Sequence, residues 1–363
     1  MSFLLLSFVV SLLSTLAVLR SSHRHASLSA DTEISGPQKF HQQPVPRIGG
    51  FGVLLAMVAG ALLAQYTRPA VSESLWLLLA CALPAFMGGF AEDLTKKVSA
   101  SRRLLTALVS AALAVWLLGS VVRHTTIPGV DTLIQLEPFA IALTLLVLTG
   151  VSNSINIIDG FNGLASMCVL IMLMALAYVG LQVQDRLVLT AALISAGAVL
   201  GFFVWNFPGG LIFLGDGGAY LLGFMVAELG ILLIVRHPDI SPLFPLLLCA
   251  YPIFETLFSM YRRKVLKGVA SSAPDGIHMH TLVHRRLVRQ MIGNATAFQL
   301  TTRNSLTSPY LWLLCSLSVI PAVLWWHHTA VLTGFLLLFM VSYVVMYWRI
   351  VRFKAPKWLL PRR

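Results

Sequence analysis

The sequence predicts an all-α polytopic integral membrane protein with about eleven transmembrane helices. Of its 363 residues, 57% are hydrophobic and only 11% are charged, and the mean hydropathy is +0.82. Soluble domains carry roughly 25% charged residues, so this chain has too little charge to cover a water-exposed surface. The composition therefore excludes a soluble globular protein, a disordered protein and a disulfide scaffold.

Each predicted span is a run of about 20 mostly apolar residues, the length that crosses a bilayer as a helix. The first run has no basic residue ahead of it and no small-residue cleavage site, so we interpret it as an uncleaved anchor rather than a signal peptide. The run at 139–152 is short and is expected to extend at either end. The expected spans are residues 1–19, 48–66, 75–91, 104–122, 139–152, 164–182, 188–206, 218–235, 243–261, 309–327 and 331–350.

The basic residues predict the orientation, with the N-terminus outside and the C-terminus cytoplasmic. When the loops alternate from that start, all of the 26 Lys and Arg residues fall inside except Arg68, Arg123, Arg186 and Arg236. Cytoplasmic loops of membrane proteins carry such an excess, so we attribute the net charge of +12 to topology and expect no nucleic-acid partner. A single membrane domain over 1–363 is predicted, with cytoplasmic loops at about 20–47, 92–103, 153–163, 207–218 and 262–308.

Four cysteines lie inside apolar runs and form no CxxC motif. Buried cysteine behaves as a small hydrophobic residue, so we expect these four to pack in the core. Neither a disulfide nor a zinc site is predicted for them.

An acidic pair, Glu92 and Asp93, follows a Gly88-Gly89 step and precedes Lys96 and Lys97. Paired carboxylates can hold Mg²⁺ or activate a nucleophile, and a nearby lysine can meet a phosphate. A helix end that simply carries interfacial charge is an equal alternative for this segment.

A second polar segment places Asn153, Asn156, Asp159 and Asn162 at intervals of three residues, with no Lys or Arg among them. A helical arrangement would keep neighbouring members of this series close together. Uncompensated polar groups between two spans are costly unless they bind something. We therefore favour a ligand site over a polar helix-packing motif.

Two further segments contribute charge on the same side. Asp216 stands between glycines at the start of a span, where it is either a ligand group open to close approach or a helix N-cap. His280 and His284 are spaced by four residues and precede a pair of arginines. This pattern favours an anion-recognition loop over a zinc site, which lacks a fourth ligand, or a loop attracted to anionic lipid.

Taken in this order, these segments resemble the polyprenyl-phosphate N-acetylhexosamine-1-phosphate transferase family. The resemblance runs from Pro46-Arg47-Ile48-Gly49-Gly50 to the histidine loop, and N-x-x-N-x-x-D-G-x-N-G-L at 153–164 is its most specific element. It implies transfer of a sugar 1-phosphate from a UDP-N-acetylhexosamine to undecaprenyl (polyprenyl) phosphate, with release of UMP. It also implies a Mg²⁺ cofactor, an active site on the cytoplasmic face of a bacterial inner membrane and a role in starting an O-antigen-like cell-envelope polysaccharide. Relatives can be dimers, so a homodimer is a further expectation.

The same resemblance implies roles for individual residues. Asn156 and Asp216 would ligate Mg²⁺, and Asp93, Glu92 and Asp159 would be catalytic. The implied substrate-binding residues are Arg47, Lys96, Arg102, Arg103, Asn162 (at the uracil), and His278 and His280 (at the sugar). The usual Asp-Asp pair is Glu-Asp here, Thr281 replaces a further histidine of many bacterial relatives, and Glu255 receives no role.

The expected chemistry is phosphoryl transfer between two anions, in which positioning and charge neutralisation lower the barrier. We expect direct attack by the lipid phosphate rather than a covalent aspartyl-phosphate intermediate. A secondary transporter is the alternative function, because intramembrane acids such as Glu228 would suit it. Transporters, however, tend to show repeats and midplane polar sites, whereas the motifs here gather at one face. The signature of the CDP-alcohol phosphotransferases is absent.

Overall fold

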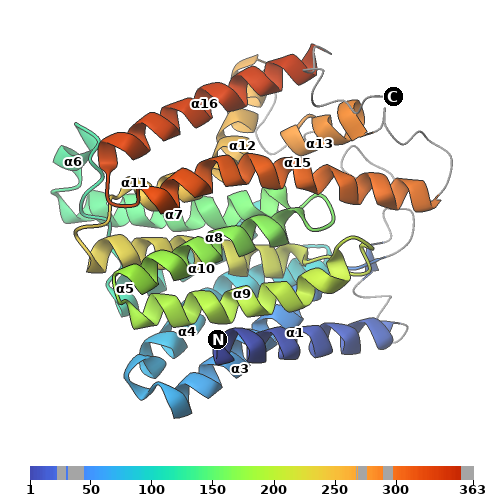
Figure 1. The fold of residues 1–363 in the computed structure, drawn as a ribbon, viewed down its shortest axis with the longest axis horizontal. Coiled ribbons are helices and arrows are strands. Elements are labelled where there is room, and N and C mark those ends of the chain that lie inside the picture. The colour runs from blue at the N-terminus through green and yellow to red at the C-terminus, as the bar shows by residue number, and fades with distance from the viewer. Residues whose placement is uncertain (23–29, 32–44, 267, 269–275, 289–296, 353–363) are drawn as a thin grey trace.

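The computed structural model describes residues 1–22, 30–31, 45–266, 268, 276–288 and 297–352 of the chain, and within them it is almost entirely helical (Figure 1). Among these residues, ten helices are long and apolar enough to cross a membrane. The ten are α1 (Ser2–Arg20), α3 (Gly49–Thr67), α4 (Pro69–Thr95), α5 (Ala100–Leu118), α7 (Glu137–Ile158), α8 (Leu164–Gln182), α9 (Arg186–Asn206), α10 (Gly215–Arg236), α15 (Ala297–Leu324) and α16 (Thr329–Val351). The chain is a polytopic all-α membrane protein, as the composition predicts.

The long helices run side by side, horizontally in Figure 1, with α16 at one edge of the bundle and α1 and α3 at the other. Helix α10 lies between these edges and is buried along nearly its whole length. A membrane helix that is apolar on every face and buried by its neighbours forms the core of its bundle. The first turn of α10 is therefore surrounded by the ends of several other helices.

The eleventh expected span, 243–261, is not one continuous helix. It forms α11 (Leu243–Leu248) and α12 (Ala250–Tyr261), which meet at Cys249. Pro252 has no N–H to donate to the carbonyl of Leu248, so one helical hydrogen bond is missing at this point. The expectation of a single unbroken helix here is wrong, although the two pieces follow one another directly.

The N-terminal helix α1 packs tightly against α9. Its buried face consists of Phe3 and small polar residues, and it meets Gly197 and Gly201 of α9. A Cβ atom on Gly197 would lie 2.2 Å from the carbonyl oxygen of Leu4, and one on Gly201 would lie 2.4 Å from the carbonyl oxygen of Phe8. Small residues let membrane helices approach this closely, so α1 packs as part of the bundle, while its role as an uncleaved anchor stays a prediction.

Several helices extend further toward one end of the bundle than the hydropathy predicts. Helix α4 continues to Thr95, α7 to Ile158, and α10 begins at Gly215, so most of the predicted site residues lie in terminal helical turns rather than in loops. The α7–α8 and α9–α10 connections and α13 (Met279–Val283) lie at this same end, on the right in Figure 1.

The remaining elements are short. They are β1 (Ala30–Asp31) and β2 (Val45–Pro46), which pair antiparallel, α6 (Val130–Leu133), and the π-helical turns η1 (Arg262–Leu266) and η2 (His284–Val288). All four cysteines are buried free thiols, which confirms that they are core residues.

Candidate active site

The carboxylate of Asp93, in the last turns of α4, holds the N-terminus of α10. Its Oδ1 accepts the backbone N–H of Asp216 at 2.8 Å, and its Oδ2 accepts the backbone N–H of Gly217 at 2.9 Å. The first N–H groups of a helix have no partner within that helix, and a negative charge is stabilised beside them. Asp93 is 1% exposed, so this buried acid serves as a cap supplied by another helix.

Glycines bring the ends of α3, α4 and α10 into backbone contact at this point. A Cβ atom on Gly89 would lie 2.5 Å from the carbonyl carbon of Asp216, and one on Gly50 would lie 2.4 Å from the Cα of Gly218. The N–H of Gly50 also donates to the carbonyl of Leu214 at 2.8 Å. The three helix ends are thus fixed relative to one another by contacts that leave no room for side chains.

Two arginines surround the side chain of Asp216. Arg47, just ahead of α3, places Nη2 3.2 Å from Oδ1 of Asp216 and 3.9 Å from Oδ1 of Asp93. Arg103, in the first turn of α5, forms an ion pair with Oδ2 of Asp216. Arg102 is exposed at the surface, so the structure separates the two candidates and selects Arg103 for this cluster.

The polar end of α7 lies beside the start of α10. The hydroxyl of Tyr220 donates to Oδ1 of Asn153 at 2.9 Å. One turn nearer the end of the bundle, α7 carries Asn156 and α10 carries Asp216. These two predicted metal ligands therefore lie in neighbouring helical turns near the same end of the bundle.

Asp159 follows the last residue of α7 and is half-buried. Burial raises the pKa of its carboxyl to about 7, while the positive charge of Arg47 opposes that rise. The negative charge of Asp159 also repels the negative charge of Asp93. Asp159 therefore belongs to the same electrostatic cluster as Asp93, Asp216, Arg47 and Arg103.

Glu92 and Lys96 lie at the α4–α5 connection. Oε2 of Glu92 accepts the backbone N–H of Val98 at 2.6 Å, so Glu92 shapes the connection, while its negative charge also acts on Asp93. Lys96 ends α4 in the left-handed conformation and is exposed. A role for these two residues toward a substrate stays a prediction.

The histidine segment covers the α7–α8 connection. The ring of His280 contacts Phe161 edge-on at a centroid distance of 5.5 Å and stacks on His278 at 5.1 Å. Its Nε2 would lie 3.3 Å from a Cβ atom on Gly160. The structure thus brings together the two segments 153–163 and 278–280, which the sequence separates by more than a hundred residues.

Asn162 is 4% exposed and is held by partners that the sequence does not reveal. Its side-chain amide donates to the hydroxyl of Ser305 at 3.1 Å, and its backbone N–H donates to Oδ1 of Asn304 at 2.8 Å. The hydroxyl of Ser308 donates to its carbonyl at 2.6 Å. Asn162 therefore joins the α7–α8 connection to α15, and contact with uracil stays a prediction for it.

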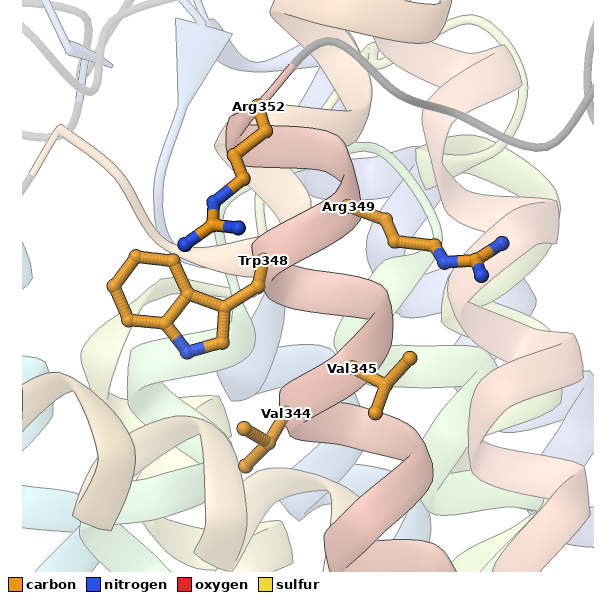
Figure 2. Close-up of a pocket in the computed structure, with 5 residues that line it drawn as sticks. All are labelled: Val344, Val345, Trp348, Arg349 and Arg352. Atoms are coloured by element: carbon orange, nitrogen blue, oxygen red, sulfur yellow. The ribbon is translucent and has the colours of Figure 1, made fainter.

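A separate hollow lies on α16, and its described lining consists of Val344, Val345, Trp348, Arg349 and Arg352 (Figure 2). None of the clustered residues around Asp216 belongs to it.

Within the described residues, no three His, Cys, Asp or Glu side chains group to hold a metal ion. The candidate site is the contact region of α3, α4, α5, α7 and α10, because the clustered acidic and basic side chains lie there.

Comparison with known proteins identifies the family. The family model for glycosyl transferase family 4 matches residues 75–234, which include the acidic pair, the asparagine series and Asp216. A probable undecaprenyl-phosphate N-acetylglucosaminyl 1-phosphate transferase of Bacillus subtilis is 29% identical over 279 residues, covering 76% of each chain. The decaprenyl-phosphate N-acetylglucosaminephosphotransferase of Mycolicibacterium smegmatis is 32% identical over 282 residues, covering 68% of this chain and 66% of the relative.

An undecaprenyl-phosphate alpha-N-acetylglucosaminyl 1-phosphate transferase of Thermotoga maritima is 26% identical over 250 residues, covering 69% of this chain and 72% of the relative. Fold and site together define a multi-span membrane transferase. The chain belongs to glycosyl transferase family 4, the family of the polyprenyl-phosphate N-acetylhexosamine-1-phosphate transferases. A transporter is not supported, since the polar residues of the cluster gather at one end of the bundle.

Proposed function

We propose that this protein transfers an N-acetylhexosamine 1-phosphate from a UDP-sugar to undecaprenyl phosphate, releasing UMP. The observation that carries the proposal is the convergence of Asp93, Asp216, Arg47 and Arg103 where four helix ends meet. We further propose that this end of the bundle faces the cytoplasm of a bacterial inner membrane. The reaction would start the assembly of a cell-envelope polysaccharide.

In the reaction, an oxygen of the lipid phosphate attacks the phosphorus that carries the sugar, and the bond from that phosphorus to the UMP oxygen breaks. Both reactants are anions, so neutralisation of their charge is the main requirement. Arg47 and Arg103 would serve this task, because their ion pairs place both guanidinium groups beside Asp216 and guanidinium groups bind phosphates in two-pronged geometry.

Asp93 is better suited to positioning than to covalent catalysis. Both of its oxygens accept backbone N–H groups of α10, so the carboxylate is held in place as part of the contact between α4 and α10. This supports direct attack by the lipid phosphate. Asp93 would hold the start of α10, and with it Asp216, in the geometry that the reaction needs.

Magnesium is proposed as the cofactor, with Asp216 and Asn156 as its protein ligands. Their carboxylate and amide oxygens are the donor types that Mg²⁺ prefers, and this ion usually takes its other ligands from water and substrate phosphates. Two protein ligands thus fit this metal even though no three His, Cys, Asp or Glu side chains group together among the described residues. Bound Mg²⁺ would neutralise the diphosphate and stabilise the departing UMP oxygen.

The test is UMP release by the purified protein in detergent, with undecaprenyl phosphate and a panel of UDP-N-acetyl sugars. We expect Mg²⁺-dependent release with one or more of the sugars, loss of release on addition of EDTA, and none with the Asp216→Asn variant. Absence of release with every sugar from protein that remains folded would overturn the proposal. The sugar that gives the largest kcat/KM identifies the donor.

A further inference from the structure

Glu255, in α12, is a buried carboxylate whose two oxygens both have partners in the histidine segment or on α16. Oε1 lies 2.9 Å from Nδ1 of His278 and accepts the backbone N–H of Met279 at 3.0 Å. Oε2 accepts the hydroxyl of Tyr343 at 2.9 Å. Glu255 is 1% exposed, and a buried charge is retained only where such partners compensate its desolvation.

This arrangement determines how the ring of His278 is oriented. A carboxylate accepts hydrogen bonds, so Nδ1 of His278 carries its hydrogen toward Glu255. That hydrogen bond fixes the tautomer and the plane of the imidazole, in the way that a carboxylate orients a functional histidine elsewhere. The opposite ring atom, Nε2, then lies on the side of His278 that faces away from Glu255.

The residue just before His278 is held from two sides. The carbonyl of Ile277 accepts the hydroxyl of Tyr347 at 3.1 Å and Nη1 of Arg262 at 3.0 Å. Nη1 of Arg262 also donates to the hydroxyl of Tyr347 at 2.5 Å. Tyr343 and Tyr347 are one helical turn apart on α16, so one face of α16 serves both Glu255 and Ile277.

From His278 the contacts continue to the candidate active site. The rings of His278 and His280 stack nearly parallel, with 11° between their planes. His280 in turn lies against Gly160, next to Asp159. An unbroken series of contacts therefore connects Glu255, through two histidine rings, with the polar end of α7.

We propose that Glu255 is a positioning residue for sugar recognition, which fixes His278 and the start of α13 so that His280 is held over the α7–α8 connection. Tyr343 assists by holding the second carboxylate oxygen. This inference rests on the proposed function, because the ligand read by the histidines is taken to be the N-acetyl sugar of the donor. Glu255 would not touch the reacting atoms.

The main test is the Glu255→Gln variant, which keeps the shape but removes the charge and puts a donor in place of one acceptor oxygen. We expect KM for the UDP-sugar to rise about tenfold or more, as loss of a charge-assisted hydrogen bond predicts, while kcat changes less than threefold. Tyr343→Phe should raise KM in the same direction by a smaller factor. An unchanged KM in Glu255→Gln, or equal losses in KM and kcat, would overturn the inference.

A matched control is Tyr251→Phe. Tyr251 is as deeply buried as Tyr343 and lies on the same helix as Glu255, and its hydroxyl has no hydrogen-bond partner in the described part of the chain. KM and Tm should both stay at their wild-type values. If Glu255→Gln does not fold, Tyr343→Phe decides the question alone, because a wild-type KM for that variant contradicts the inference.

A second readout needs no turnover. Nitrogen-15 spectra of histidine-labelled protein, assigned with His278→Gln, should show the Nδ1–H form of His278 in the wild type and a mixed or Nε2–H form in Glu255→Gln. If the wild type releases no UMP with any sugar, the proposed function fails, and the spectra still report whether Glu255 orients His278. An identical His278 signal in both proteins would overturn the inference on its own.

Discussion

Asp93 accepts a hydrogen bond from the backbone N–H of Asp216, a residue 123 positions later in the chain, at 2.8 Å. The acid of one helix thus holds the acid of another through the main chain, while the side chain of Asp216 stays with Arg47 and Arg103. The two acids consequently have different functions, and their variants should differ in a measurable way.

The Asp93→Asn variant should lose both activity and stability. An Asn side chain accepts only one of the two N–H groups and turns its own NH₂ toward the other, which costs about 1–3 kcal/mol for the unsatisfied group. Asp216→Asn leaves the backbone contact with Asp93 in place, so it should lose activity with a smaller fall in Tm. Thermal unfolding in detergent and UMP release measure the two effects. An Asp93→Asn protein with wild-type Tm would contradict the capping role.

Arg103 and Arg102 offer a comparison between neighbours in sequence. Arg103→Ala removes an ion pair to Asp216 and should lower kcat/KM at least tenfold, in line with about 1.5–3 kcal/mol for a hydrogen bond to a charged group. Arg102→Ala removes an exposed side chain and should change kcat/KM much less. Equal losses in the two variants would show that the cluster around Asp216 does not decide the function of these arginines.

Gly89 is expected to tolerate no side chain. Its Cβ would lie 2.5 Å from backbone atoms of Asp216 and Gly217, so Gly89→Ala must push α4 away from α10, at a cost of about 1–3 kcal/mol. Activity should fall as well, because Asp93 lies one turn further along α4. Gly150→Ala in α7 is the control, since nothing lies within 4 Å of its Cβ, and alanine should leave Tm unchanged or slightly higher. Equal Tm values for the two variants would refute this packing argument.

The raised pKa of Asp159 should make the stability of the folded protein depend on pH. Burial raises the pKa of this carboxyl from the ordinary 3.8 to about 7, so the folded protein keeps this group protonated at pH values where the unfolded chain has already ionised it. The resulting penalty is absent below pH 3.8, grows as the pH rises, and is complete above about pH 7. Asp159→Asn should therefore raise Tm at pH 8 by a few degrees and raise it less at pH 5. The same increase at both pH values would contradict the raised pKa of Asp159.

Most of the spans could be predicted from sequence, because each is a long apolar run. The end of the bundle with the candidate site could also be predicted, because the polar motifs lie between those runs. The helix ends were harder. Hydropathy ends a span at the first charged residue, but Glu92 and Asp93 continue α4 because backbone groups of Val98 and α10 satisfy them. The break at Cys249 could not be predicted from proline alone, because α4 continues through Pro84 and α15 through Pro309 and Pro321.

The contacts within the candidate site could not be predicted from sequence patterns. The capping of α10 by Asp93 joins residues that no local rule connects, and the partners of Asn162 on α15 carry no motif. The structure instead assigns Asn162 a set of buried hydrogen bonds that the spacing of the asparagine series did not indicate. Glu255 had no assignable role in the sequence, because that role depends on the folded position of His278.

The depth of the four native thiols makes this protein a convenient starting point for chemical mapping. Since every one of them is buried, a water-soluble maleimide should leave the unaltered chain largely unlabelled while it is folded, because only an accessible thiolate reacts quickly. Single cysteines placed in each loop can then be probed from either side of intact cells or sealed vesicles. Such labelling would establish directly which face of the membrane each helix end occupies.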